Sequence, residues 1–201
     1  MKNPALLEER RTHLVEAATE VFFQRGFDRA TVNEIAERCG WSVGGLYRYV
    51  RRKDDILYLV CAEIYRKIGR DALGTTNLPS PDPAQRFTAA FTAYCANIQC
   101  HRRQVLLMYR EYGRLSPDAQ QYFMHIEADL RDAFREIVDD GVTHGIFVCE
   151  DPELFATDCV MRAHTLALKG WALQSRPLND TAAKLVTWTL RSLSAPTRTN
   201  T

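Results

Sequence analysis

The chain has 201 residues, of which 46% are hydrophobic and 25% charged, a balance that excludes a disordered chain and favours a globular protein. Its formal net charge of +1 excludes a uniformly basic nucleic-acid-binding protein. The charge is uneven, because residues 1–70 carry 13 Lys and Arg against 10 Asp and Glu, whereas residues 71–201 carry 13 against 15. No stretch approaches the ~20 apolar residues that a membrane span needs, so we expect no membrane insertion.

The six cysteines are spread along the chain, and none forms a Cys-x-x-Cys pair. No histidine cluster has zinc-ligand spacing, so we expect neither a metal site nor a cofactor. In apolar helical surroundings a free thiol behaves as a small hydrophobic side chain, which predicts reduced, structural cysteines. The N-terminus, MKNPALLEERR, lacks an apolar signal segment, and both features favour a cytoplasmic protein.

The first helices are marked by apolar spacing and by capping residues. Apolar residues recur at helical spacing over residues 14–22, and Gly26 ends that helix. Thr31 followed by Glu34 forms a capping box that begins a short helix ending at Gly40. Ser42 is the N-cap of the next segment, SVGGLYRYV. After the basic run RRK, a longer fourth helix is lined by Leu57, Val60, Cys61, Ile64 and Ile68.

The rest of the chain is also predicted to be helical. The segment GTTNLPSPDP is a linker with three prolines, after which Asp82 and Pro83 begin a helix expected to continue through Arg114. Further helices are expected over residues 117–140, 152–174 and about 180–194. The chain is therefore predicted to be all-α, with about nine helices.

Two short helices joined by a tight, glycine-containing turn are typical of the helix-turn-helix motif. Here the turn is residues 39–42, and Gly40 would supply its left-handed conformation. The second helix carries hydroxyl groups, and five cations occur with no acidic residue between them: Arg38, Arg48, Arg51, Arg52 and Lys53. Hydroxyls and cations together favour binding to the phosphates of DNA. The alternative is a solvated charged face, with Tyr47 and Tyr49 packed between helices.

The stretch from Ala17 to Leu57, AATEVFFQRGFDRATVNEIAERCGWSVGGLYRYVRRKDDIL, resembles the tetracycline-repressor (TetR) family of regulators. A dozen positions agree with the family pattern in one register: Gly26, Phe27, Thr31, Ile35, Ala36, Gly40, Ser42, Gly44, Leu46, Tyr47, Tyr49 and Lys53. Trp41, Val43, Gly45 and Val50 depart from it. The resemblance implies a three-helix helix-turn-helix domain over residues 1–52. A long fourth helix would join it to a helical effector-binding and dimerisation domain over residues 53–196, with a disordered tail at 197–201.

The resemblance also implies which residues contact operator DNA. Thr31 would donate to a phosphate, and Lys53 would contact another through its ammonium group and the helix N-terminus. Arg48 is the only long donor within the recognition helix, so a bidentate contact with guanine is expected from it. The predicted set is Thr31, Ser42, Val43, Gly44, Gly45, Tyr47, Arg48, Tyr49 and Lys53.

A homodimer is implied as well, formed by the last two helices of each chain. Both helices have a wider apolar surface than a lone surface helix needs, although burial inside the subunit is the alternative. The predicted interface is Trp171, Val186, Leu190 and Leu193, with Leu185 and Trp188 on an adjacent stripe. Two recognition helices about 34–36 Å apart would address successive major grooves of a palindrome.

Residues 105–115, VLLMYREYGRL, are rich in large side chains. The overlapping stretch 107–117, LMYREYGRLSP, resembles segments of family members that sense acyl-coenzyme A thioesters. We therefore expect a pocket for a small hydrophobic effector such as an acyl-CoA thioester or a fatty acid. The predicted lining is Tyr94, Ile98, Met108, Tyr109, Tyr112, Phe123, Met161, His164, Thr165 and Leu168. Arg102, Arg103 and Arg110 would meet the phosphates of such a ligand, with solvated side chains as the equal alternative. Ordinary core packing is the alternative for each lining residue.

The sequence contains no dinucleotide-binding glycine motif, P-loop, HExxH motif or nucleophile elbow, so we expect no enzyme. The predicted function is a dimeric repressor that an effector releases from its operator. The alternative is a DNA-binding regulator or architectural protein without an effector.

Overall fold

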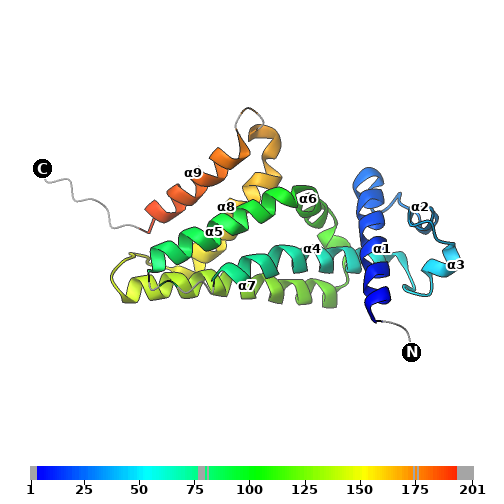
Figure 1. Cartoon of the computed structure of the whole chain (residues 1–201), viewed down its shortest axis with the longest axis horizontal. Coiled ribbons are helices and arrows are strands. Elements are labelled where there is room, and N and C mark those ends of the chain that lie inside the picture. The colour runs from blue at the N-terminus through cyan, green and yellow to red at the C-terminus, as the bar shows by residue number, and fades with distance from the viewer. Residues whose placement is uncertain (1–3, 77–79, 81, 174, 176, 194–201) are drawn as a thin grey trace, which may run out of the picture. The chain divides into compact units, whose positions relative to one another are not determined.

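The computed structural model describes residues 4–76, 80, 82–173, 175 and 177–193, with side chains described except at 4–7, 69–76 and 178. The described residues contain helices and no strand (Figure 1), which confirms the predicted all-α class. The α-helices are α1 (Pro4–Arg25), α2 (Val32–Arg38), α3 (Val43–Leu46), α4 (Lys53–Thr76), α5 (Pro83–Cys100), α6 (Arg102–Glu111), α7 (Pro117–Thr143), α8 (Pro152–Leu168) and α9 (Leu178–Arg191). Two short 3-10 helices are η1 (Tyr112–Arg114) and η2 (Gly170–Leu173).

Most helices begin at the capping residues that the sequence indicates. Asp82 accepts a hydrogen bond from the backbone N–H of Ala84 at the start of α5, and Pro83 is its first residue. Asp151 does the same for Leu154 at the start of α8. Each carboxylate satisfies a backbone N–H that has no partner within its own helix. The predicted starts of α5 and α8 are therefore confirmed.

Two predicted helices are shorter than the sequence pattern suggested. The helix expected through Arg114 is broken at His101, where φ is −108° and ψ 22°, so that α5, α6 and η1 replace it. The helix expected to reach Gln174 ends at Leu168 and is followed by η2, and Gln174 itself lies outside the described residues. Apolar spacing continues across the break at His101, and no glycine or proline marks it, so the sequence carried no stop signal there.

By its internal contacts the chain divides into two compact units. Unit 1 comprises Met1–Arg66 and Leu106–Phe123, and unit 2 comprises Lys67–Val105 and Met124–Thr201. These bounds differ from those of the two functional domains predicted to meet after residue 52. The division into a DNA-binding and an effector-binding domain stays a prediction. The disordered tail predicted at 197–201 lies outside the described residues.

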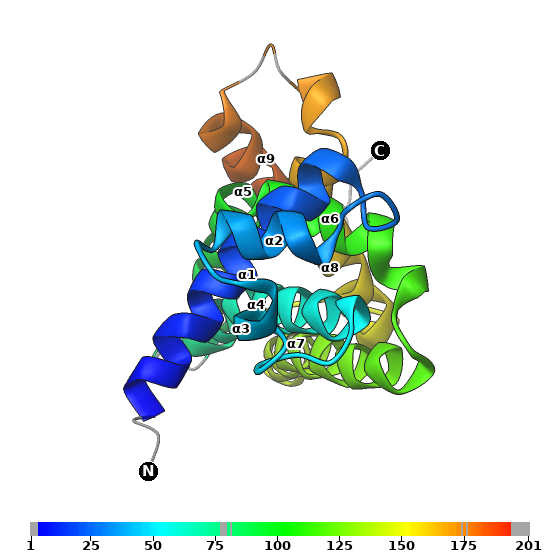
Figure 2. The same cartoon turned by 90° about the vertical axis from the view of Figure 1, so that its right-hand side faces the viewer.

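Unit 1 contains the helix-turn-helix segment. In it α2 packs against both α1 and α3 (Figure 2). Its fully buried side chains include Phe22 of α1, Ile35 of α2, Leu46 of α3 and Leu57 of α4. Burying such side chains stabilises the fold by roughly 1.5–3 kcal/mol each, so these four residues hold the helices together.

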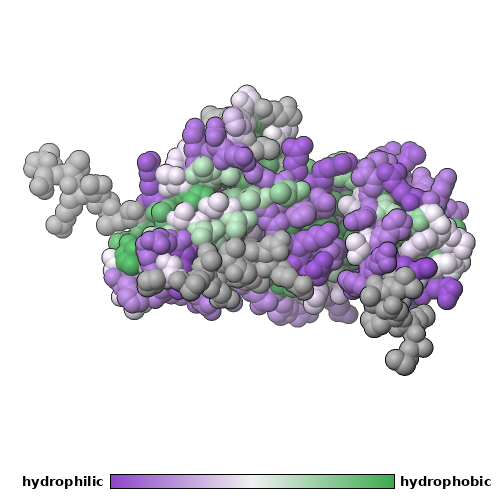
Figure 3. Space-filling model, viewed as in Figure 1, coloured by the Kyte–Doolittle hydropathy of each residue, from purple (hydrophilic) through white to green (hydrophobic). Residues whose placement is uncertain are grey.

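Unit 2 is built around α5, which packs against α8 and α9. Its core is aromatic, with Phe87 and Phe91 of α5 both about 6 Å, between ring centroids, from Phe134 of α7. In the space-filling view, hydrophobic residues lie along α5 between hydrophilic neighbours (Figure 3). Among the described residues, no helix combines the length and the hydrophobicity that crossing a bilayer requires.

Candidate nucleic-acid interface

The helix-turn-helix is held by hydrogen bonds that its own residues supply. Thr31 caps α2: its hydroxyl accepts the N–H of Glu34 and donates to the Glu34 carboxylate, at 3.2 and 3.0 Å. The same carboxylate accepts the backbone N–H of Thr31, and these bonds lower the pKa of Glu34. Gly40 turns the chain with a φ of 65°, a left-handed conformation that favours glycine. The hydroxyl proton of Thr31 therefore has an acceptor within the protein, which a phosphate would have to displace.

The recognition segment is one turn of helix followed by tighter turns. α3 covers only Val43–Leu46, and Ser42 caps it by accepting the N–H of Gly45 at 3.0 Å. The next backbone hydrogen bonds, from Arg48 to Gly45 and from Tyr49 to Leu46, span three residues rather than four. Two adjacent glycines lower the helix propensity of such a short segment, so packing and the Ser42 cap must hold it.

This segment exposes most of the side chains that were predicted to contact DNA. Gly44, Tyr47, Arg48 and Tyr49 are exposed, with Tyr47 at 50% and Tyr49 at 36%. Val43 and Gly45 are half-buried, and Leu46 is fully buried as a packing residue. The ring of Tyr49 also packs 5.3 Å from that of Trp41, between ring centroids, so Tyr49 serves packing and remains accessible.

Four arginines near the motif are exposed: Arg38, Arg48, Arg51 and Arg52. Within the part of the chain that the structure describes, their side chains have no carboxylate or carbonyl partner. Asp55, which the sequence analysis did not single out, accepts the backbone N–H groups of Arg51 and Arg52 at 2.8 and 2.9 Å. This cap fixes the backbone at the start of α4. Unpaired guanidinium groups on a fixed backbone attract phosphate.

Lys53 is placed differently from the prediction. Its ammonium group donates to the backbone carbonyls of Phe27, Asp28 and Ala30, at 2.8, 3.2 and 3.0 Å, and lies 4.4 Å from the centroid of the Phe27 ring. A lysine ammonium has three donors, and all three are used here. In this structure the ammonium group holds the loop between α1 and α2, and the predicted phosphate contact of Lys53 stays a prediction.

The same loop is clamped by residues at the end of α6, a feature that the sequence analysis missed. The buried Glu111 accepts the backbone N–H of Phe27 at 3.3 Å and the Nε–H groups of Arg110 and Arg114 at 2.7 and 3.0 Å. Arg110 also donates to the carbonyl of Phe22, and Arg114 pairs with Asp28. The guanidinium of Arg110 is thus paired within unit 1, and its contact with an effector phosphate stays a prediction. Only the charge-rich sequence YREYGR signalled this network.

The residues predicted to line an effector pocket do not share one environment. Met108, Tyr109, Tyr112 and Phe123 belong to unit 1, and Tyr94, Ile98, Met161, His164, Thr165 and Leu168 belong to unit 2. Tyr109 and Met161 are 41% and 46% exposed, so they are surface residues in this structure. Phe123 stacks on Tyr65, with ring centroids 4.7 Å apart. A common pocket for this set stays a prediction.

Tyr94 and His164 form a polar pair in the core of unit 2. The Tyr94 hydroxyl lies 2.7 Å from Nε2 of His164, and both residues are at most 4% exposed. Burial lowers the pKa of His164 to about 4, which keeps the imidazole neutral at pH 7 and lets Nε2 accept the phenolic proton. The pair fits either reading of the sequence, a core histidine with a hydrogen bond or a polar anchor for a ligand.

Two of the four residues predicted at a dimer interface are core residues of the single chain. Val186 and Leu193 are 7% and 0% exposed, so this part of the prediction is corrected. Leu190 is half-buried, whereas Trp171 is 68% exposed and Trp188, on the adjacent stripe of α9, is 53% exposed. The apolar period of α9 predicted both stripes but could not tell which one faces α5 and α8.

Family models match both parts of the chain. Residues 14–58 match the model of "Bacterial regulatory proteins, tetR family", and residues 80–164 match the "Tetracyclin repressor-like, C-terminal domain". The chain is 30% identical over 178 residues to the HTH-type transcriptional regulator HbdR of Aromatoleum sp. (strain CIB), a match that covers 87% of this chain and 76% of HbdR.

Solved structures show the same fold. A tetR-family regulatory protein from Rhodococcus RHA1 is 22% identical and aligns with a TM-score of 0.85 over 93% of this chain and 98% of its own. AibR, in complex with isovaleryl coenzyme A and operator DNA, is 17% identical and aligns with a TM-score of 0.77 over 89% of this chain and 97% of its own. With its helix-turn-helix and these matches, the chain belongs to the TetR family of bacterial transcriptional regulators.

Proposed function

We propose that this protein is a cytoplasmic repressor that binds palindromic operator DNA as a homodimer through α2 and α3. The observation that carries the proposal is the exposed recognition segment, where Tyr47, Arg48 and Tyr49 lie beside arginines that have no partner in the described structure. Hydroxyls and guanidinium groups position the protein on phosphates, and Arg48 is the candidate for reading a base. A segment this short reads few base pairs, so two copies are needed for specificity.

The homodimer is supported by apolar side chains exposed on unit 2. Trp171 of η2 and Trp188 of α9 are more than half exposed, as is Leu154 of α8, at 65%. Large exposed apolar side chains are candidates for an interaction surface, and tryptophan often dominates the binding energy of such surfaces. A second copy of this chain is the partner that the symmetric reading of a palindrome requires.

An acyl-CoA thioester is the effector that we propose. AibR, which shares this fold, was solved with isovaleryl coenzyme A and operator DNA. The segment at residues 107–117 of this chain also resembles acyl-CoA-sensing members of the family. A ligand that binds better to one spacing of the two DNA-binding segments shifts the protein toward that spacing, and a coupling of about 1–3 kcal/mol suffices for a switch.

The test begins by selecting operator sequences from random duplexes with the purified full-length protein. The selected consensus is expected to be palindromic, with half-sites about one helical turn apart. Binding to that operator is then measured by fluorescence anisotropy with isovaleryl-CoA, stearoyl-CoA or unacylated coenzyme A present. We expect an acyl-CoA to weaken operator binding about 5- to 150-fold and unacylated coenzyme A to have little effect.

The outcomes separate the parts of the proposal. If neither thioester changes operator binding or the melting temperature, the acyl-CoA effector is wrong, while the DNA-binding function stands. If an acyl-CoA strengthens operator binding instead, the protein is not released by it and the repressor mechanism is wrong. If no duplex binds at low salt, the regulatory function itself is overturned.

A further inference from the structure

Trp41 joins three elements of unit 1 at the turn between α2 and α3. Its ring centroid lies 6.0 Å from that of His13 on α1 and 5.3 Å from that of Tyr49, which follows α3. The guanidinium carbon of Arg10, one helical turn before His13, lies 5.9 Å from the centroid of the same indole. The half-buried Trp41 therefore holds one cation and one exposed tyrosine against a single aromatic surface.

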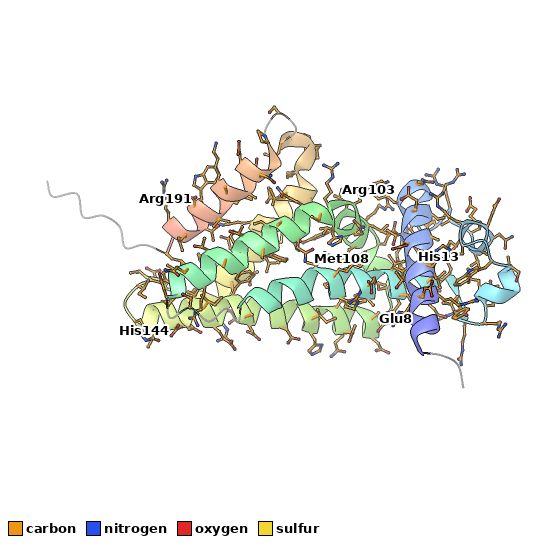
Figure 4. All side chains as sticks on the ribbon, in the orientation of Figure 1. Glu8, His13, Arg103, Met108, His144 and Arg191 are labelled. Atoms are coloured by element: carbon orange, nitrogen blue, oxygen red, sulfur yellow. The ribbon has the colours of Figure 1, made fainter. Side chains whose placement is uncertain are left out.

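The position of α1 beside this turn is fixed by a hydrogen bond. His13, labelled in Figure 4, has Nε2 3.1 Å from the carbonyl oxygen of Cys39 at the end of α2. This contact ties the middle of α1 to the residue at which the turn begins. Arg10 on the same helix is thereby kept close to Trp41.

The guanidinium of Arg10 remains available to an anion. Arg10 is exposed, and in the part of the chain that the structure describes its guanidinium has no carboxylate or carbonyl partner. Its contact with the face of Trp41 uses the positive charge and leaves the five N–H donors unoccupied. This contrasts with Lys53, whose three donors are all bound to backbone carbonyls.

We propose that Arg10 is an additional contact for the phosphodiester backbone of duplex DNA, and that Trp41 is the residue that positions it. Trp41 is also next to Ser42, the cap of the recognition segment, and packs on Tyr49. Arg10 and Tyr49 are thus both held by the same indole, and the proposed DNA-binding surface extends from α3 onto α1. This inference rests on the proposed function of residues 31–53 in binding duplex DNA.

The chain offers a matched control for Arg10. Arg11 is the next residue of α1, carries the same charge and is also exposed, but in the described structure it makes no contact with Trp41. We compare Arg10→Ala with Arg11→Ala on a 30-base-pair mixed-sequence duplex, with fluorescence anisotropy at a series of NaCl concentrations. One lost phosphate contact lowers the slope of log K against log salt by about one unit for each chain bound. We expect that decrease for Arg10→Ala and no such decrease for Arg11→Ala.

The role of Trp41 is tested by a double-mutant cycle on the same duplex. Trp41→Ala is expected to lower the salt slope as Arg10→Ala does, and the double variant is expected to bind no more weakly than Trp41→Ala alone. Trp41→Phe keeps an aromatic face and is expected to retain most of the slope. Circular dichroism melting shows whether each variant is folded. If Trp41→Ala unfolds, the salt slopes of Arg10→Ala and Trp41→Phe still test the inference.

Four results would overturn the inference. Arg10→Ala with the wild-type slope would mean that Arg10 touches no phosphate. Equal losses for Arg10→Ala and Arg11→Ala would point to general electrostatic attraction rather than a positioned contact. Additive effects of Arg10 and Trp41 would show that Trp41 does not position Arg10. A wild-type protein that binds no duplex would overturn the DNA-binding function first, and this contact with it.

Discussion

At the scale of single residues, Lys53 shows how one side chain can be committed to the fold rather than to a ligand. Its ammonium binds three carbonyls between Phe27 and Ala30, in a half-buried site next to the Phe27 ring. We expect Lys53→Ala to lower the free energy of unfolding by about 1–2 kcal/mol, because charge-assisted hydrogen bonds are lost in a partly solvated site. Urea denaturation monitored by circular dichroism measures this loss.

The control for Lys53 is Arg52→Ala, which removes a neighbouring exposed cation that has no side-chain partner in the described structure. This change is expected to leave the unfolding free energy within about 0.5 kcal/mol of wild type. If Lys53→Ala is instead as stable as wild type and lowers the salt slope of duplex binding by about one unit, the sequence-based phosphate contact was right.

His164 makes the stability of unit 2 depend on pH. Its pKa is lowered from 6.5 to about 4 by burial, so between these values the unfolded chain binds a proton that the folded chain does not. The contribution of His164 is therefore present above pH 6.5 and is lost as pH falls toward 4. The full loss is about 3 kcal/mol, from about 1.4 kcal/mol per pKa unit. Urea midpoints measured from pH 7 to pH 4.5 follow this decrease.

Carboxylates titrate in the same range, so the comparison is with His164→Gln. Glutamine can still accept a hydrogen bond from Tyr94 but does not titrate. The decrease of stability between pH 6.5 and 4.5 is expected to be smaller in His164→Gln than in wild type. Parallel pH profiles for the two proteins would mean that His164 binds its proton equally well in the folded state.

At the scale of elements, local signals predicted the helix starts and apolar periods predicted the helices. The capping box at Thr31 and the Asp-Pro pairs at the starts of α5 and α8 could be predicted from the sequence, because each requires only a few residues at fixed spacing. Gly40 likewise indicated the turn after α2, although the helix itself ends two residues earlier, at Arg38. The capping box and the glycine therefore predicted where α2 begins and where the turn of the helix-turn-helix lies.

What the sequence could not supply were the contacts between distant residues. Glu111 reaches Phe27 across 84 positions, and Lys53 reaches the same loop across about 25. Gly141 illustrates the point, because a Cβ there would clash with the ring of Phe147, although nothing in the local helical pattern demands glycine. Such requirements come from packing, which periodicity alone does not encode.

At the scale of the whole molecule, the exposed tryptophans of unit 2 carry the prediction of a dimer. We expect Trp188→Glu to make the protein monomeric, because a carboxylate placed in an apolar interface would be buried without a partner. Operator binding is expected to weaken as well, since the two recognition segments would no longer be linked. Size-exclusion chromatography with light scattering at micromolar concentration gives the mass, and anisotropy on the selected operator gives the affinity.

The matched control is Met124→Glu on α7, which lies outside α8 and α9. Met124 is 62% exposed and Trp188 is 53% exposed, so both changes place a carboxylate where an exposed apolar side chain was. If the surface containing Trp188 forms the interface, Met124→Glu stays dimeric and binds the operator as wild type does. If both variants stay dimeric, the interface lies elsewhere on the chain. If the wild type is already a monomer at micromolar concentration, the proposal that a dimer presents two recognition segments to the operator is wrong. A monomeric Trp188→Glu that still binds the operator with wild-type affinity would break the link between dimerisation and DNA recognition, because two half-sites could then be read without a fixed spacing.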